Sequence, residues 1–396
     1  MNDNQAILAH RMDKIGMHRY GWGMFVVCGL GFAVDNIFIQ AVSSIQIPLQ
    51  LEFNLSNTNL GVLTSALPIG MLIGSTLCGI LSDVYGRLSI FTISLWLSGI
   101  TALVSAVART PTTIFIAISL LGVFIGGNIP IDAALFLESI PNSKHSLLTL
   151  LSAFWPIGQI ITSICAFLII PNSNLTCSDS TNCPFSSNVG WRILQVVLGS
   201  LTLLMAATRL FLFNVQESPM FLVTKQRFKE AVRVLNAISN HNGTSISEIR
   251  ESDFHCDTEL TSKPKVYKII NSMLGPQYFR TTILVWLIWI FVSLGNNIFF
   301  AFITKFISLN AGNVPLSTGD TYRNYLIISF LSVFGSVIGM YSSDSFLGRK
   351  YTLGLSTMLL SIILFCLTIF TSSPAQLTLT ILASITQTSM YHYFEL

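Results

Sequence analysis

Ten apolar runs, each about as long as a membrane-spanning helix, restrict what this sequence can fold into. A helix that crosses the roughly 30 Å hydrocarbon core needs about 20 mostly apolar residues. The runs are continuous rather than alternating, which favours helices over barrel strands. We expect spans over about 20–42, 60–82, 88–107, 113–138, 146–170, 190–212, 281–306, 322–343, 351–371 and 375–394.

The composition points to the same class of protein. Of the 396 residues, 52% are hydrophobic and only 10% are charged, whereas soluble domains carry about 25% charged residues. A net charge of +3 gives no reason to expect a nucleic-acid partner. The first run follows a mainly polar stretch of nineteen residues without a small-residue cleavage site, so we interpret it as a retained span rather than a signal peptide. The sequence predicts an all-α, multi-pass protein of the lipid bilayer.

The basic residues predict the orientation, because cytoplasmic loops carry an excess of Lys and Arg. With the N-terminus inside, cytoplasmic segments and the adjacent helix ends collect 17 of the 21 Lys and Arg, including Arg209 at the end of the sixth span. The remaining four are Arg109, Arg192, Lys305 and Arg323. We therefore expect a cytoplasmic N-terminus, in the plasma membrane or an endomembrane.

The loop after the fifth span, "PNSNLTCSDSTNCP", holds two of the seven cysteines. This orientation places the loop outside, where Cys177 and Cys183 can form a disulfide in an oxidising compartment. The alternative is a pair of free thiols in a polar loop. The acceptor sequence Asn174-Leu175-Thr176 lies in the same loop and predicts a glycan on Asn174.

A polar stretch over 214–279 separates six spans from four, so we expect three parts, 1–213, 214–279 and 280–396. The stretch opens with "ESPMFLVTKQRFKEAVRVLNAI", in which Ser218 can cap a helix that has Pro219 at its first position. Apolar residues then recur at helical spacing from Phe228 to Ile238. This pattern predicts an amphipathic helix along the cytoplasmic face, or else a helical linker that packs on nothing in particular.

Charged and turn residues interrupt the apolar sequence at two corresponding places, "GILSDVYGRLSI" after the second span and "YSSDSFLGRKYTLG" after the eighth. The first set is Asp83, Gly86 and Arg87, and the second is Asp344, Gly348 and Arg349. A short tight loop needs a residue that can adopt positive φ, which suits glycine. An acid at the end of a helix opposes the helix dipole, so Asp83 needs a compensating partner, and Arg87 is four residues away. Internal repeats of this kind build many transporters.

Gly79-x-x-x-Asp83-x-x-Gly86-Arg87 resembles the signature loop of the major facilitator superfamily, and "ESPMFL" resembles the inter-half motif of its sugar-porter-like branch. "GLGFAVDNIFIQ", "GGNIPIDAALFLESIP" and "LLSAFWPIGQ" look most like the synaptic-vesicle-two-related proteins and their fungal relatives. The resemblance implies two pseudo-symmetric six-helix halves, locked together on the cytoplasmic side by the two loops. Since the superfamily has twelve helices and this chain shows ten, we expect the last two to be missing.

Asp35 is the clearest candidate for a role in transport. A carboxylate within a span costs about 2.5–3.5 kcal/mol on insertion scales, so such residues face a cavity or a partner. At 1.5 Å per residue, Asp35 lies about 22 Å into the first predicted span, in its outer half. It either binds a proton that is coupled to substrate movement or holds neighbouring helices together. Asp132 and Glu138 should lie towards the cytoplasmic boundary, Glu138 in the charge cluster there, so Asp35 and Asp132 should not pair directly.

Five amides complete the predicted substrate or proton pathway: Asn36, Asn128, Gln159, Asn296 and Asn297. Asn297 matches the substrate-facing asparagine of the family's seventh span, and Gln159 resembles the glutamine of its fifth. Each amide is equally well explained as a hydrogen-bonding link between helices. Phe291 and Val292 occupy the positions where sugar porters carry two glutamines, which argues against a hexose carrier.

We therefore expect a monomeric secondary transporter that moves a small organic solute by alternating access, with proton coupling through Asp35 as a further hypothesis. The alternatives are a non-transporting sensor or vesicle protein of the same fold, and an inactive truncated product. Five of the six histidines lie outside the spans, and no metal-ligand or Ser-His-Asp set is present in the sequence. We expect no enzymatic activity, no metal and no cofactor.

Overall fold

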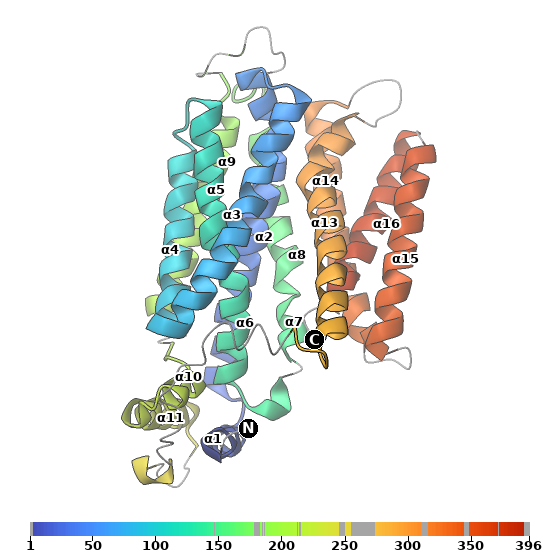
Figure 1. Cartoon of the computed structure of the whole chain (residues 1–396). Helices are drawn as coiled ribbons and strands as arrows, with labels where there is room; N and C mark the ends of the chain where they lie inside the picture. Colours follow the sequence, from blue (N-terminus) through green and yellow to red (C-terminus); the bar gives the residue numbers. More distant parts are fainter. Residues whose placement is uncertain are drawn as a thin grey trace.

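The structure is a computed structural model that describes residues 3–145, 147–177, 183, 185, 187–211, 213, 215–244, 250–254, 274–309, 316–343, 348–370 and 372–391. Within these ranges the chain forms helices joined by loops, without a strand. Figure 1 shows two groups of roughly parallel helices, one from the first part of the chain and one from its last part. The predicted all-α fold is confirmed.

In the described part of the chain, helices occupy all ten predicted runs. Seven are long and apolar enough to cross a membrane by length and composition, with α5 and α6 counted together. These are α2 (Arg19–Phe53), α3 (Asn57–Tyr85), α4 (Arg87–Ser105), α5 (Pro111–Gly126) with α6 (Asn128–Ser139), α9 (Gly190–Phe211), α13 (Phe279–Leu309) and α15 (Gly348–Ile369). The other three runs form α7 (Leu147–Leu151) with α8 (Phe154–Ile169), α14 (Thr318–Ser343) and α16 (Ser373–Tyr391). We call α2–α9 the N-terminal bundle and α13–α16 the C-terminal bundle.

The first long helix is longer than the sequence predicts. The predicted span stops at residue 42, because the polar residues Ser43, Ser44 and Gln46 lower the hydropathy beyond it, but α2 continues to Phe53. These polar side chains are buried against other helices, so their polarity does not end the helix. Asp35 consequently lies near the middle of α2, about 25 Å from each end at 1.5 Å per residue, and its predicted place in the outer half of the helix is wrong.

The α3 and α5 helices cross in direct backbone contact. A Cβ atom on Gly74 would lie 1.9 Å from the carbonyl oxygen of Val123, and one on Gly122 would lie 2.3 Å from that of Leu67. Only glycine lets the two backbones approach this closely, as in other membrane helix pairs. This crossing fixes one wall of the N-terminal bundle.

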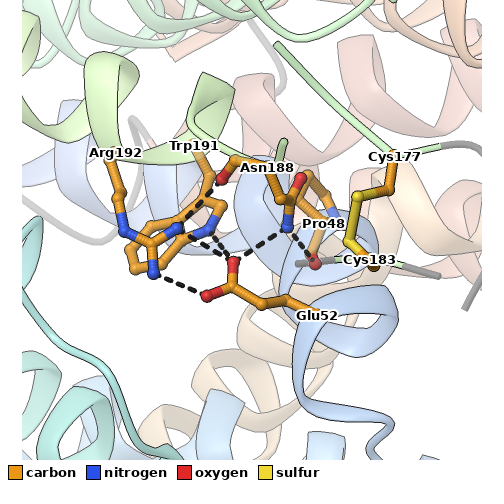
Figure 2. The surroundings of a disulfide bond; sticks show 7 residues. All are labelled: Pro48, Glu52, Cys177, Cys183, Asn188, Trp191 and Arg192. Atoms are coloured by element: carbon orange, nitrogen blue, oxygen red, sulfur yellow. Dashed lines mark hydrogen bonds and ion pairs between the residues drawn. A yellow bond between two sulfur atoms is a disulfide. The ribbon is translucent and has the colours of Figure 1, made fainter. Parts of the chain in front are cut away.

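Cys177 and Cys183, in the loop between α8 and α9, are joined by a disulfide with a Cα–Cα distance of 5.6 Å (Figure 2). The Asn188 side chain follows in the same loop and donates a hydrogen bond to the carbonyl oxygen of Pro48, at 2.9 Å. The loop is thereby attached to the last turns of α2. We call this end of the molecule the disulfide end.

A buried ion pair strengthens that attachment. The Glu52 carboxylate accepts hydrogen bonds from Arg192 at 2.6 and 2.9 Å, from the Trp191 indole at 2.8 Å and from the Asn188 amide at 3.0 Å (Figure 2). The two charged side chains are only 7% (Arg192) and 5% (Glu52) exposed. From the sequence, Arg192 is recognised only as a basic residue on the outer side, and Glu52 carries no signal.

Three short helices cover the opposite end, which we call the α1 end: α1 (Asp3–Ile15), α10 (Pro219–Thr224) and α11 (Phe228–Asn242) (Figure 1). The α1 helix is not among the elements predicted from the sequence, although Leu8, Met12 and Ile15 recur at helical spacing and are buried. A helix with this pattern covers an apolar surface of the bundle.

The amphipathic helix predicted after Pro219 is two helices. Ser218 caps α10 as predicted, its hydroxyl accepting from the Phe221 amide at 3.0 Å. Gln226, in the break between the helices, adopts φ of 58°, which a continuous helix does not allow. Leu235 and Ile238 on α11 are buried, and α11 contacts α1, α2 and α10. The alternative of a linker packed on nothing is wrong.

Candidate transport site

A cavity of about 550 Å³ lies between the N-terminal and C-terminal bundles. Its lining residues are Phe32, Met71, Leu72, Ser75, Gly126, Ile129, Pro130, Ala133, Leu148, Trp289 and Ser293. The lining is thus mostly apolar, with two serine hydroxyls. None of the predicted pathway amides is among these residues; Asn297 lies one turn from Ser293 and donates to its carbonyl oxygen at 2.8 Å. The side chain of Asn296 lies outside the described residues.

Hydrogen bonds between the bundles lie on the other side of this cavity, towards the disulfide end. The first α2 residue that bonds to the C-terminal bundle is Gln40, which lies nearer the disulfide end of α2 than Phe32, the α2 residue that lines the cavity. The Tyr325 hydroxyl donates to Gln40 at 2.7 Å, and the Lys305 ammonium donates to Gln50 at 2.5 Å. The bundles are therefore joined at the disulfide end and separated by the cavity nearer the α1 end.

Two further pairs complete this closure. The hydroxyls of Ser43 and Thr304 lie 3.3 Å apart, and Tyr322 donates to the carbonyl oxygen of Ser44 at 2.5 Å. All four side chains are at most 1% exposed. The hydrogen bonds lie within an apolar core that the two bundles share, in which Ile303 and Ile328 cluster with Ile45 of α2. The hydrogen bonds can be broken and replaced by water when the bundles separate.

Asn36 links helices in this structure. Its amide donates to the carbonyl oxygen of Trp155 at 2.7 Å and accepts from Gln40 at 3.3 Å. Gln40 in turn accepts from Tyr325, so the chain of bonds runs from α8 through α2 to the C-terminal bundle. Gln40 and Tyr325 are not among the residues predicted from the sequence; the position of Gln40, one turn after Asn36, is the signal that could have identified it. Gln159 is 1% exposed, and its amide nitrogen has no hydrogen-bond partner among the described residues.

Asp35 is fully buried within the N-terminal bundle. One of its oxygens accepts a hydrogen bond from the Asn128 amide on α6, at 3.3 Å. Asn128 is itself oriented by the Ser94 hydroxyl on α4, which donates to the amide oxygen at 2.5 Å. Asp35 and Asn128 are therefore in direct contact, although neither lines the cavity between the bundles.

Asp132, one turn after Asn128, is paired with Arg209 of α9 at 3.7 Å. The Arg209 guanidinium also donates to the carbonyl oxygen of Val27, at 2.8 and 3.2 Å. Its central carbon lies 3.6 Å from the centroid of the Phe91 ring, which is a cation–π contact. Asp132 and Arg209 are thus both held inside the bundle.

The burial of Arg209 is the feature that the sequence does not predict. Arg209 lies in the last turn of α9, in agreement with the expected position at a helix end, but it is 3% exposed, because Asp132 and Phe91 bind it inside. Asp132 was expected at a different depth from Asp35, and its carboxylate lies against Gly31, one turn before Asp35. As predicted, the two carboxylates make no direct hydrogen bond in the described part of the chain.

The signature loop after α3 has the predicted local geometry. Gly86 adopts φ of 107°, a conformation that favours glycine. Arg87 lies 3.9 Å from Asp83, which is 73% exposed, and 2.9 Å from Glu138, which is 19% exposed. Glu138 is therefore the main partner of Arg87, and Asp83 contributes a weak contact.

The "ESPMFL" segment docks onto this loop. The Glu217 carboxylate accepts from the backbone amides of Arg87 at 3.1 Å and Leu88 at 3.2 Å, at the start of α4. The Ser218 hydroxyl donates to Glu138 at 2.6 Å. An anion at a helix N-terminus is favoured by the free amides and the dipole. Glu217, which the sequence analysis does not assign, thus ties the inter-bundle segment to the loop.

The second signature loop is described only in part. Gly348 adopts φ of 63°, which agrees with the predicted need for glycine. Asp344 and the side chain of Arg349 lie outside the described residues.

The sequence matches the model of the sugar (and other) transporter family over residues 15–394. The chain belongs to this family. It is 31% identical over 385 residues to the major facilitator-type transporter hxnZ of Emericella nidulans, covering 91% of this chain and 68% of hxnZ. It is 32% identical over 394 residues to MFS siderochrome iron transporter 1 of Ceriporiopsis subvermispora, covering 94% of this chain and 74% of that protein.

The fold of this transporter is similar to that of solved family members. The partially occluded, inward-open structure of the xylose transporter XylE from E. coli superposes with a TM-score of 0.70, at 17% identity, over 94% of this chain and 85% of XylE. The predicted major facilitator fold and the resemblance to this superfamily are confirmed. The protein is a secondary active membrane transporter.

Proposed function

We propose that the protein moves a small organic solute by alternating access between its two bundles, with the cavity at Phe32 and Trp289 as the substrate site. The observation that carries this proposal is the arrangement of that cavity, open between the bundles on one side and closed by hydrogen bonds on the other. Transporters of this kind bind substrate between two repeats that rock against each other. Residues 1–213 and 280–396 are then the moving halves, and 214–279 is the connection.

The predicted orientation gives the direction of access. With the N-terminus in the cytoplasm, the α1 end faces the cytoplasm and the disulfide end faces the other side. The described conformation is then open towards the cytoplasm. The Glu217–Arg87–Glu138 contacts at the α1 end belong to the N-terminal bundle and the inter-bundle segment, so they remain intact in this state.

The cavity lining supports a mainly apolar solute. Ser75 and Ser293 are the polar side chains of the lining, and a polyol bound there would leave hydroxyl groups without partners, at a cost of about 1–3 kcal/mol each. This agrees with the sequence argument against a hexose, from Phe291 and Val292. The name of XylE, a proton:xylose symporter, supports coupling to protons but not the choice of solute.

Asp35 is the residue we assign to proton coupling. It is fully buried, and its second carboxylate oxygen has no hydrogen-bond partner among the described residues. An ionised carboxylate at mid-helix is costly, so protonation of Asp35 substantially lowers the free-energy cost of burying its side chain. A cycle in which Asp35 binds and releases one proton per turnover links proton movement to solute movement.

Transport by the purified protein in liposomes tests this function. We expect saturable uptake of at least one member of a panel of aromatic and aliphatic organic anions, cations and polyols, driven by an inward proton gradient. Asp35→Asn should abolish accumulation but keep exchange of solute for solute, which needs no net proton movement. Glu230→Gln, at an exposed ion pair on α11, is the matched control.

Accumulation by Asp35→Asn equal to that of the unaltered protein would remove Asp35 from the coupling mechanism. A protein that binds a solute of the panel but transports none would favour the alternative of a sensor with the same fold.

A further inference from the structure

Two carboxylates and one guanidinium meet inside the N-terminal bundle. Asp35 of α2 and Asp132 of α6 are 0% exposed, and Arg209 of α9 is 3% exposed. Asp132 lies 3.7 Å from Arg209. If both acids are ionised, the group carries one uncompensated negative charge among side chains that are at most 3% exposed. Burying an unpaired charge is far costlier than burying a pair.

Gly31 makes room for this group. A Cβ atom at this position would lie 1.6 Å from a carboxylate oxygen of Asp132 and 2.6 Å from a guanidinium nitrogen of Arg209. The ion pair therefore fills the space that a side chain on α2 would occupy. Since residues four apart lie on the same face of a helix, Asp35 is the next side chain of α2 along that face.

Hydrogen bonding within the group is incomplete. Among the described residues, one oxygen of Asp35, both oxygens of Asp132 and one nitrogen of Arg209 have no hydrogen-bond partner. Buried polar groups are nearly always hydrogen-bonded in native proteins, and each exception requires an explanation. In the described structure Arg209 lies 3.7 Å from Asp132, too far for a hydrogen bond, so all four atoms remain available to a shared proton or to a guanidinium that moves between the two carboxylates.

No other charge compensates the group in the described part of the chain. The helices α5, α7 and α8 also contact α2 but carry no charged residue. The charged helix α11 contacts α2 as well, near its first turn, where the Tyr20 amide donates to Asn242. Asp83 and Glu138 lie at the α1 end, in the signature loop cluster, and Lys305 lies towards the disulfide end with its ammonium on Gln50. Among the described residues, the buried thiol of Cys28 on α2 is a further titratable group close to Asp132 and Arg209.

We propose that Asp35, Asp132 and Arg209 form a single proton-binding unit that holds one proton between two carboxylates. With the proton on Asp35, Arg209 pairs with Asp132, as in the described structure. When the proton moves to Asp132, Arg209 pairs with Asp35, and when it leaves, the two carboxylates compete for one guanidinium. Acids this close titrate as a pair and not as separate residues. Only the use of this proton in coupling depends on the proposed function.

Arg209 also gives the unit a route to water. Together with Thr92 and Val215 it lines a second cavity, of about 430 Å³, between the start of α4 and the end of α9. This cavity lies beside the signature loop, at the α1 end. A proton can therefore reach the unit from that end without entering the cavity between the bundles.

Infrared difference spectroscopy of the purified protein in lipid nanodiscs tests the unit, with pH as the probe and no solute added. A protonated carboxyl has a C=O stretch distinct from that of a carboxylate. We expect one buried carboxyl band that titrates in the unaltered protein and is absent in both Asp35→Asn and Asp132→Asn. In either variant one acid faces one guanidinium, and the resulting ion pair has no need of a proton. Glu230→Gln should retain the band.

The double variant Asp132→Asn/Arg209→Gln supplies the decisive comparison. It leaves one acid and no base, so the band should return, now on Asp35. A band that disappears in Asp35→Asn but is unchanged in Asp132→Asn would show that Asp35 titrates alone and would overturn the proposal. A band present in both single variants would place the proton elsewhere.

Elution of each variant as a monodisperse peak confirms folding before measurement. If Asp132→Asn does not fold, a missing band in the Asp132→Asn/Arg209→Gln variant still contradicts the unit. The spectra do not involve transport, so a failure of the uptake assay would count against the proposed function and leave this result intact.

Discussion

Replacing Glu52 by glutamine should weaken the attachment of the disulfide-bearing loop to the end of α2. The carboxylate accepts four hydrogen bonds, two of them from Arg192. A glutamine of nearly the same shape can keep one acceptor oxygen, but its amide nitrogen must then face another donor. The Arg192 guanidinium, 7% exposed, would remain buried without a counter-charge.

The size of the effect follows from this burial. Removing one partner of a buried ion pair costs about 3–5 kcal/mol, because the remaining charge is left uncompensated. Replacing both partners by uncharged residues of similar volume is often nearly neutral. We therefore expect Glu52→Gln to lower the free energy of unfolding by about 3–5 kcal/mol, and Glu52→Gln/Arg192→Met to recover most of that loss.

Unfolding in mixed micelles of increasing SDS content, followed by tryptophan fluorescence, measures these differences. The matched control is Glu230→Gln, which removes an equally short ion pair, with Arg227, on the exposed face of α11; we expect no measurable change there. A loss for Glu52→Gln no larger than that for the control would refute the reasoning, as would a double variant less stable than Glu52→Gln alone.

Three further predictions concern other contacts. Gly74→Ala should destabilise the protein by about 1–3 kcal/mol, because the added methyl group overpacks the α3–α5 crossing. Gly79→Ala on the same helix should have no such effect, since nothing lies within 4 Å of its Cβ position. Equal effects of the two variants in SDS unfolding would contradict the backbone contact. Glu217→Gln should speed hydrogen exchange at the Arg87 and Leu88 amides by about 5–30-fold, the equivalent of one or two kcal/mol, and unchanged rates would exclude the capping role. Mass mapping without reduction should recover Cys177 and Cys183 as one linked peptide, and alkylation of both as free thiols would contradict the disulfide.

The long helices could be predicted from sequence because a single physical requirement, about 20 apolar residues per crossing, acts locally. Thus 60–82 was predicted for α3, which spans Asn57–Tyr85. The polar end of α2 was missed, since the partners that bury it, such as Thr304 and Tyr322, lie more than 250 residues away in the chain. A window of hydropathy cannot detect such partners.

In the candidate site, too, only the residues with a local sequence signal could be predicted. Asp35 could be identified because a charge within an apolar run is rare and costly. Arg209 could not, because a basic residue near the end of a span equally well reaches the membrane surface. Whether it is buried depends on Gly31, Phe91 and Asp132, which come from three other helices.

Thiol labelling at two positions tests the alternating-access account most directly. Ser293 lines the cavity between the bundles, and Thr304, three turns further along α13, is buried in the closure at the disulfide end. We expect a membrane-impermeant maleimide to label Ser293→Cys from the side that carries α1, and to label Thr304→Cys from the opposite side far more slowly. Labelling of Ser293→Cys only from the disulfide side, or equally fast labelling of both from that side, would contradict the account.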